Sequence, residues 1–215
     1  MTTISAPHTT ALTTELRYLA LGDSYTIGEA VDEAGRWPMQ LARLLRQEGV
    51  LLGDPRIIAT TGWTTDELDA AITAAEPLGQ HDFVSLLIGV NNQYRGRDVE
   101  EYRTQFAALL WRAIGFAGNR PDRVLVLSIP DWGVTPFGAK SGRDVAQIAR
   151  ELDAYNLAAR EACTQRGVAF VDITPVSRAR GAEPAMVADD GLHPSAAMYT
   201  EWARLAFPVA HRLLA

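Results

Sequence analysis

The sequence predicts an α/β fold: a doubly wound three-layer sandwich in which helices cover both faces of a parallel sheet. Short apolar runs alternate along the chain with longer segments of helical periodicity, and this alternation is typical of parallel α/β proteins. Polar residues able to do chemistry follow the apolar runs. In such folds the ligand binds beyond the carboxyl ends of the strands, so these residues are expected at one edge of the sheet.

Five apolar runs are predicted to be the strands. The run at 83–88 is nearly all apolar, as a strand covered on both faces should be, whereas the run at 57–59 is the weakest. The predicted strands span residues 18–21, 57–59, 83–88, 124–127 and 168–171.

The segments between these runs carry helix signals. Thr64 and Glu67 have the spacing of a capping box that opens a helix towards residue 75. Ser195 is a candidate cap for a final helix reaching residue 214. Further helices are expected from 37 to Gly49, over 99–116 and over 143–166, while 130–142, rich in Gly, Pro and aromatic residues, is expected to be a loop.

Length and composition restrict the function classes. The 215 residues suit one domain over 15–215, preceded by a flexible tail over 1–14. The net charge of −6 gives no general attraction to nucleic acid or to anionic lipid. No segment has the pattern of a signal peptide or approaches the ~20 apolar residues of a membrane span, so we expect a cytoplasmic protein without membrane insertion.

No cofactor or metal is expected. Cys163 is alone, so no intrachain disulfide can form, and we expect it to be a buried apolar residue on a helix. Asp189, Asp190 and His193 could in principle bind a cation, but no second histidine or carboxylate cluster supports them. No Gly-x-Gly-x-x-Gly follows the first strand, which argues against a dinucleotide site.

Two segments hold the candidate groups for acyl transfer. Ser24, in Gly22-Asp23-Ser24-Tyr25, follows the first strand and is a candidate nucleophile, although a serine there is more often a turn or cap residue. His193 is a candidate base, and Asp190 lies close enough to orient its ring, with Asp189 as a rival partner.

Gly62 and Asn91 are candidates for stabilising an oxyanion. A glycine lets its backbone N–H approach a ligand closely, and an asparagine amide is a neutral donor. Together with the Ser24 backbone N–H they would supply three donors.

Taken together, these blocks resemble the SGNH or GDSL hydrolase superfamily of esterases and lipases. The Ser, Gly, Asn and His for which that family is named occur here in the family order, as Ser24, Gly62, Asn91 and His193, over about residues 19–199. The resemblance implies a flavodoxin-like α/β/α sandwich around a five-stranded parallel sheet. It also implies Ser24 as nucleophile, His193 as base, Asp190 as the orienting acid by its Asp-x-x-His-Pro spacing, and an oxyanion hole of Ser24, Gly62 and Asn91.

Two positions depart from the family pattern. Tyr25 replaces the leucine of the GDSL name, at a position without a catalytic role. Asn92 replaces the aspartate of the usual Gly-x-Asn-Asp block, which is not the oxyanion donor. Catalysis should survive both changes, while the structural role of Asn92 is open.

The substrate is expected to be a small ester with a short acyl group, such as an acetyl ester of a carbohydrate. Aromatic residues near the site could bind it, namely Trp63, Tyr94, Trp132 and Phe137, and Arg95, Arg97, Lys140 and Arg143 could meet an anion, although packing and solvated charges are the ordinary explanations. A thioesterase or lysophospholipase with the same site is an alternative. A ligand-binding domain without turnover is an alternative of a different class.

Overall fold

The computed structural model describes residues 15–215, so the predicted tail over 1–14 lies outside the described residues. Five parallel strands form one sheet in the order β2-β1-β3-β4-β5. This confirms the predicted fold class, and the predicted strand positions agree with the observed ones to within about one residue. The strands are β1 (Tyr18–Gly22), β2 (Arg56–Ala59), β3 (Phe83–Leu87), β4 (Val124–Leu127) and β5 (Ala169–Val171).

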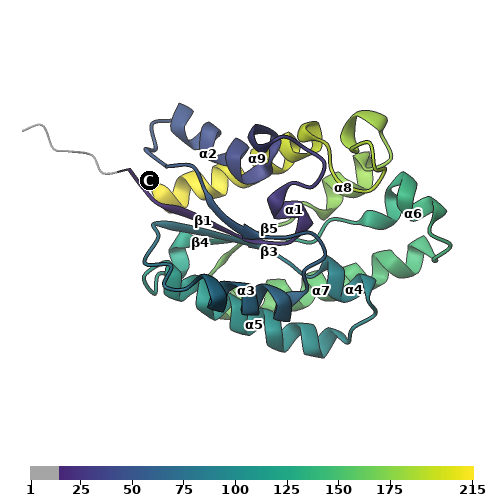
Figure 1. Cartoon of the computed structure of the whole chain (residues 1–215), viewed down its shortest axis with the longest axis horizontal. Helices are drawn as coiled ribbons and strands as arrows, with labels where there is room; N and C mark the ends of the chain where they lie inside the picture. The colour runs from purple at the N-terminus through teal and green to yellow at the C-terminus, as the bar shows by residue number, and fades with distance from the viewer. Residues whose placement is uncertain (1–14) are drawn as a thin grey trace, which may run out of the picture.

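Helices cover both faces of the sheet (Figure 1). On one face, α2 (Trp37–Gln47) packs against α9 (Ala196–Leu214). On the other face, α5 (Val99–Phe116) packs against α7 (Val145–Arg166), with α3 (Thr65–Ala75) beside α5. The remaining helices are short: α1 (Ser24–Ile27), α4 (Val90–Tyr94), α6 (Pro136–Lys140) and α8 (Thr174–Arg180), with 3₁₀ turns η1 (Glu33–Gly35), η2 (Pro121–Arg123), η3 (Trp132–Val134) and η4 (Pro184–Met186).

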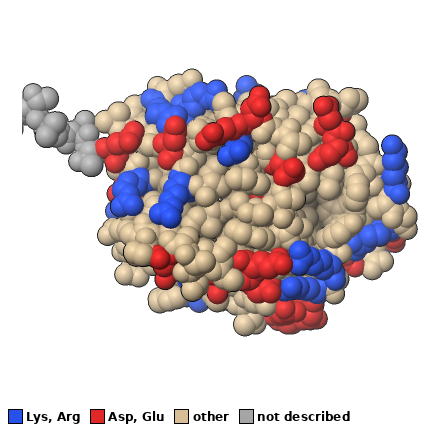
Figure 2. Space-filling view, in the orientation of Figure 1, with Lys and Arg blue, Asp and Glu red and all other residues tan. Residues whose placement is uncertain are grey.

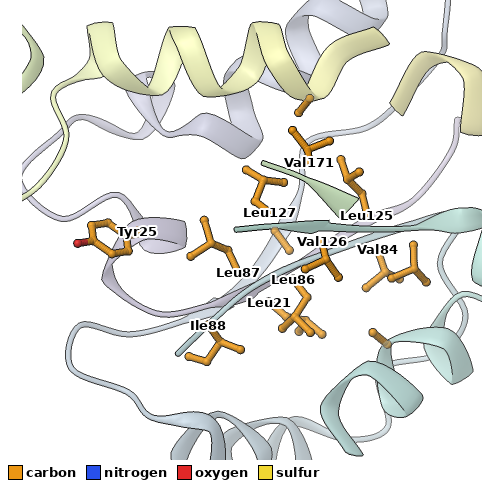
Figure 3. Close-up of a cluster of buried hydrophobic side chains, with 14 of the residues drawn as sticks. Leu21, Tyr25, Val84, Leu86, Leu87, Ile88, Leu125, Val126, Leu127 and Val171 are labelled. Atoms are coloured by element: carbon orange, nitrogen blue, oxygen red, sulfur yellow. The ribbon is translucent and has the colours of Figure 1, made fainter. Parts of the chain in front are cut away.

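The apolar core follows the strands. Every residue of β1, β3 and β4 is buried, because these strands lie inside the sheet and have helices on both faces. The two edge strands, β2 and β5, are only partly buried, which explains why the run at 57–59 is the weakest strand signal. Figure 3 shows the strand side chains packed together, with Tyr25 of α1 beyond the strand ends.

The segment 130–142 is not an irregular loop as expected. Asp131 accepts a hydrogen bond from the Gly133 N–H (2.9 Å) and begins η3, and the Thr135 hydroxyl accepts from the Gly138 N–H (3.1 Å) at the start of α6. Each of these polar side chains thus caps a short helical turn. The composition of this segment predicted that it separates β4 from α7, but it did not predict the two helical turns within it.

Several smaller expectations are confirmed. Cys163 is fully buried on α7, and burial raises the pKa of its thiol to about 12. Glu67 accepts a hydrogen bond from the Thr64 N–H (2.8 Å), as the capping box requires. Ser195 caps α9 through the Met198 N–H (3.3 Å).

Between residues 15 and 215, no helix is both long and apolar enough to cross a bilayer. In the same part of the chain, no three His, Cys, Asp or Glu side chains are grouped so that they could hold a metal ion. Acidic and basic side chains are interspersed on the face shown in Figure 2.

Candidate active site

The site lies where the strand order reverses. Strand β1 has β2 on one side and β3 on the other, so the connections after β1 and β3 leave in opposite directions and open a crevice at the sheet edge. Gly22 pairs with Ala59 and with Leu87, the last residues of β2 and β3. The three strands therefore end at the same level, and the residues that follow them begin side by side.

A cavity of about 200 Å³ occupies this crevice. Both residues of the candidate nucleophile–base pair line it, as do both further candidate oxyanion donors and three of the four candidate aromatic residues. Its lining consists of Ser24, Tyr25, Thr61, Gly62, Val90, Asn91, Tyr94, Trp132, Phe137, Leu192 and His193. Trp63 is the exception, since it lies outside this lining.

Ser24 is the first residue of α1, directly after Asp23 as its N-cap. The backbone N–H groups in the first turn of a helix have no acceptor within that helix, so the Ser24 N–H stays available to a ligand. The Asp23 side chain accepts a hydrogen bond from the Tyr25 N–H (3.0 Å) and thereby holds the turn. Ser24 itself is only 4% exposed, so it is reached through the cavity.

Asp23 is fully buried. Burial raises the pKa of its carboxyl to about 7, although hydrogen bonds from the Tyr25 and Gly89 backbones act in the opposite direction. Its Oδ2 has no hydrogen-bond partner within residues 15–215, so one oxygen of the ionised form is left without compensation. The Gly22-Asp23-Ser24-Tyr25 segment therefore carries a buried titratable group directly beside the candidate nucleophile.

His193 is held by Asp190. The Nδ1 of the His193 ring lies 2.6 Å from Asp190 Oδ2, while Asp190 Oδ1 accepts hydrogen bonds from the Leu192 and His193 N–H groups (2.9 Å each). Burial would raise the pKa of Asp190, but these hydrogen bonds, led by that of His193, lower it overall. The Tyr25 ring packs edge-on against the His193 ring, with 5.9 Å between centroids.

Asp189, the rival partner considered for His193, lies in a different place. It is exposed and lines a separate groove that contains neither Ser24 nor His193. The geometry thus pairs the His193 ring with Asp190.

Gly62 has a backbone φ of +89°, in the left-handed region that favours glycine. A Cβ built there would have Arg95 Nη2 as its nearest atom, at 3.9 Å, so backbone conformation rather than space demands glycine. The Gly62 carbonyl accepts a hydrogen bond from that same Nη2 (2.6 Å). Arg95 thereby fixes the orientation of the peptide unit that follows Gly62.

Helix α4 supplies Asn91, which binds the connection between β2 and α3, and Asn92, which binds Thr65, the first residue of α3. One N–H of the Asn91 amide donates to the Trp63 carbonyl (2.9 Å), which leaves its second N–H for a ligand. Asn92 is fully buried. Its Oδ1 accepts from the Thr65 N–H (3.1 Å) and its Nδ2 donates to the Thr65 hydroxyl (2.7 Å).

The candidate aromatic residues differ in how far they are exposed. Tyr94 is 49% exposed and can meet a substrate at the mouth, but Trp132 is only 2% exposed and forms a buried wall. The Arg143 guanidinium lies over both rings, 5.7 Å from the Tyr94 centroid and 5.2 Å from that of Trp132. Phe137 continues the wall, with its centroid 6.1 Å from that of Trp132.

Three of the four cations expected near the site, Arg95, Arg97 and Arg143, have protein partners. Arg95 binds Gly62 and Glu67, and Arg143 contacts Glu151 (3.4 Å) as well as the aromatic rings. Arg97 pairs with Asp66 (2.6 Å). Arg95 and Arg143 therefore hold parts of the site in place, a role that composition alone does not indicate.

Solved structures share the fold. TesA is 20% identical, with a TM-score of 0.70 over 92% of this chain and 99% of that chain. A lipase/acylhydrolase from Enterococcus faecalis is 19% identical, with a TM-score of 0.69 over 93% and 98%. Axe2, an acetylxylan esterase from Geobacillus stearothermophilus, is 20% identical, with a TM-score of 0.68 over 91% and 94%. No curated protein matches the chain by sequence.

A family model provides the sequence relationship that these distant structures do not. It describes the GDSL-like lipase/acylhydrolase family and matches residues 20–200, from within β1 to within α9. The matched region contains the end of β1, the other four strands and every residue that lines the cavity at the strand ends. The chain belongs to the GDSL-like lipase/acylhydrolase family.

Proposed function

We propose that this protein is a serine esterase that hydrolyses short-chain acyl esters, among them acetyl esters of carbohydrates. One observation carries the proposal: the Asp190–His193 pair, joined at 2.6 Å, presents its ring to the same cavity as Ser24. A serine, a histidine and a carboxylate that orients the histidine are the groups that acyl transfer through a serine requires.

In the first half of the reaction, Ser24 Oγ attacks the ester carbonyl carbon while His193 Nε2 accepts the hydroxyl proton. The negative charge that develops on the carbonyl oxygen is stabilised by the backbone N–H groups of Ser24 and Gly62 and by the free N–H of the Asn91 amide. Asp190 holds the ring and stabilises the imidazolium. His193 then gives its proton to the departing alcohol oxygen, which leaves the acyl group on Ser24.

In the second half, a water molecule attacks the acyl carbon and gives a proton to His193. The same three donors stabilise the second tetrahedral intermediate. Its collapse breaks the bond to Ser24 Oγ, which takes the proton back from His193, and the carboxylic acid leaves. Every proton is returned, so the cycle needs no cofactor or metal ion.

The size and lining of the cavity support a short acyl group. At about 200 Å³ the cavity lies below the usual range of about 300–1,000 Å³ for ligand pockets, which favours a small acyl group. Tyr94, half exposed at the mouth, offers a face on which a sugar ring could stack. The structural likeness to Axe2, an acetylxylan esterase, agrees with this proposal without carrying it.

The direct test is hydrolysis of p-nitrophenyl acetate, butyrate and octanoate and of acetylated xylan by the wild type and by Ser24→Ala. We expect turnover that depends on Ser24 and falls as the acyl chain lengthens. Circular dichroism of Ser24→Ala checks that the fold is retained, and labelling by a fluorophosphonate, followed by peptide mass analysis, identifies the reactive serine. Turnover that persists in pure Ser24→Ala would refute the assignment.

The alternatives give different results in the same assays. A thioesterase hydrolyses acyl-CoA better than oxygen esters, and a lysophospholipase prefers a long acyl chain on a glycerophospholipid. A ligand-binding domain without turnover leaves every ester intact and Ser24 unlabelled while the protein is folded.

A further inference from the structure

A second cavity lies directly behind the candidate active-site cavity. It measures only about 20 Å³, against about 200 Å³ for the cavity that contains Ser24. The two share four lining residues, Tyr25, Trp132, Leu192 and His193. These four side chains therefore form the wall between the two spaces.

The second cavity is apolar. Met186, Met198 and Trp202 line it, together with Val187 at its outer side, where the side chain is half buried. Its one buried polar side-chain atom without a hydrogen-bond partner within residues 15–215 is Trp202 Nε1. The rest of the space offers mainly apolar surface and favours an apolar guest.

Three polar residues that border the second cavity, Asp131, Thr135 and Ser177, are already bound to other protein groups. The Asp131 carboxylate pairs with Arg178 (2.8 Å), and the Thr135 hydroxyl donates to the Trp132 carbonyl (2.7 Å). The Ser177 hydroxyl donates to the Thr174 carbonyl (2.7 Å). These polar groups therefore do not change the apolar character of the space.

Most of the wall is fixed. The Trp132 Nε1–H donates to Gln93 Oε1 (2.8 Å), and Gln93 Nε2 donates to Glu151 Oε2 (2.6 Å). The Arg143 guanidinium covers the Trp132 ring from the other side and also contacts Glu151. This closed ring of contacts joins α4, η3 and α7 behind Trp132.

Leu192 is the part of the wall that is easiest to remove. Tyr25 is buried and His193 is bound to Asp190, whereas the Leu192 side chain is aliphatic and only half buried. Its backbone N–H, which binds Asp190 Oδ1, would remain in any substituted residue other than proline.

The chemistry of the main cavity indicates which end of the substrate meets this wall. The aromatic side, formed by Tyr94, Trp132 and Phe137, suits an acyl chain. Thr61 also lines this cavity and is polar, with its hydroxyl donating to the Glu29 carboxylate, so its part of the lining suits an alcohol.

We propose that Leu192, backed by the fixed Trp132, sets the acyl-chain length by closing the active-site cavity against the apolar cavity behind it. The inference rests on the proposed esterase function and deepens it. It assigns Leu192 as a specificity-determining residue and the second cavity as a latent subsite for the end of a longer acyl chain.

The test compares wild type and Leu192→Ala on p-nitrophenyl esters from acetate to octanoate, with kcat/KM measured for each. Burial of one methylene contributes about fourfold to an affinity, so a chain that gains two or more buried methylenes gains about tenfold or more. We expect the octanoate-to-acetate ratio of kcat/KM to rise by about that factor. Leu192→Val should shift the ratio in the same direction by less, and it serves if Leu192→Ala does not fold.

Two further variants distinguish an opening into the second cavity from a simple enlargement of the main cavity. Phe137 lines only the main cavity, so Phe137→Ala enlarges that cavity without opening the second one. Its ratio should change much less than that of Leu192→Ala. Val187 lines the second cavity and not the main one, so the double variant Leu192→Ala, Val187→Phe fills the new space and should restore the wild-type ratio.

The outcomes distinguish this inference from the function on which it rests. Absence of Ser24-dependent turnover of every ester in the wild type would refute the esterase proposal itself. Ser24-dependent turnover with equal ratios in wild type and Leu192→Ala, or with the same rise in Phe137→Ala, would refute the wall while the esterase stands. A gain for alkyl acetates with longer alcohols, instead of longer acyl groups, would overturn the assignment of the acyl end to this side.

Discussion

Asp23 should make the stability of this protein fall as the pH rises towards neutrality. The carboxyl is fully buried, and burial raises its pKa from 3.8 to about 7. Between these two values the folded state binds more protons than the unfolded state, so unfolding becomes easier as the pH increases. The loss is complete above a pH of about 7, where it amounts to about 4 kcal/mol.

Asp23→Asn tests this directly, because the amide has nearly the same shape and no charge to bury. Relative to the wild type, the variant should gain about 2–3 kcal/mol of unfolding free energy between about pH 5 and about pH 8. Urea unfolding followed by tryptophan fluorescence measures both proteins across this range. Other titrating groups are common to both proteins and cancel in the difference.

The matched control is Asp54→Asn, the same chemical change at a side chain that is 65% exposed. It reports what the exchange does at an exposed position, where the carboxylate pairs with Arg46 (3.0 Å). A difference between Asp23→Asn and wild type that stays constant with pH, or that shrinks as the pH rises, would refute the argument that Asp23 is forced to ionise in a buried place.

Three further predictions concern the candidate site. Asp190→Asn keeps the size of the side chain but removes the charge that stabilises the His193 imidazolium. We therefore expect kcat on p-nitrophenyl acetate to fall by about 10³–10⁴, with the melting temperature near that of wild type. A fall in kcat of less than tenfold would contradict the role of Asp190. Gly62→Ala forces alanine to a φ of +89°, so the free energy of unfolding measured in urea should fall by about 1–2 kcal/mol. Because the backbone N–H is then misplaced, kcat should fall by about 10²–10³. An unchanged kcat would exclude the Gly62 N–H from the oxyanion hole. Asn92→Asp loses the donor to the Thr65 hydroxyl and buries a charge, so stability should fall by about 1–3 kcal/mol, as urea unfolding measures; equal stability would show that the amide donor has no structural role.

The fold could be predicted from the sequence because its signals are local. Each inner strand is buried along its whole length, so an apolar run identifies it without knowledge of its neighbours. The two helical turns in the segment 130–142 were not predicted. Each depends on a single capping side chain, Asp131 or Thr135, within a segment of mixed composition. Helix α8 was not predicted either, and its Arg178 reaches across to Asp131 in a contact between residues far apart in sequence.

The candidate site was predictable only in part, for a related reason. Strand ends place residues at one edge of the sheet, so Ser24, Gly62, Asn91 and His193 could be grouped by position. Neither the burial of Trp132 nor its separation of two cavities could be predicted in this way. These features depend on side chains from α4, η3, α7 and the His193 segment that meet only in the folded chain.

The departure at Asn92 can be understood from what α4 does as a unit. Asn91 and Asn92 lie in α4 and Arg95 caps its end. They bind Trp63, Thr65 and Gly62 respectively, in the connection after β2 and at the first residue of α3. Thr65 presents to Asn92 both a donor, its backbone N–H, and an acceptor, its hydroxyl oxygen.

An amide matches that pair, because it accepts through Oδ1 and donates through Nδ2, while the Thr65 hydroxyl passes its own hydrogen to Gln105. An ionised aspartate could satisfy only the N–H and would be fully buried without the matching donor. Asn92 therefore fits the neutral partners that this chain provides, and the Gly62 carbonyl is held by Arg95, directly after the short helix that carries Asn91.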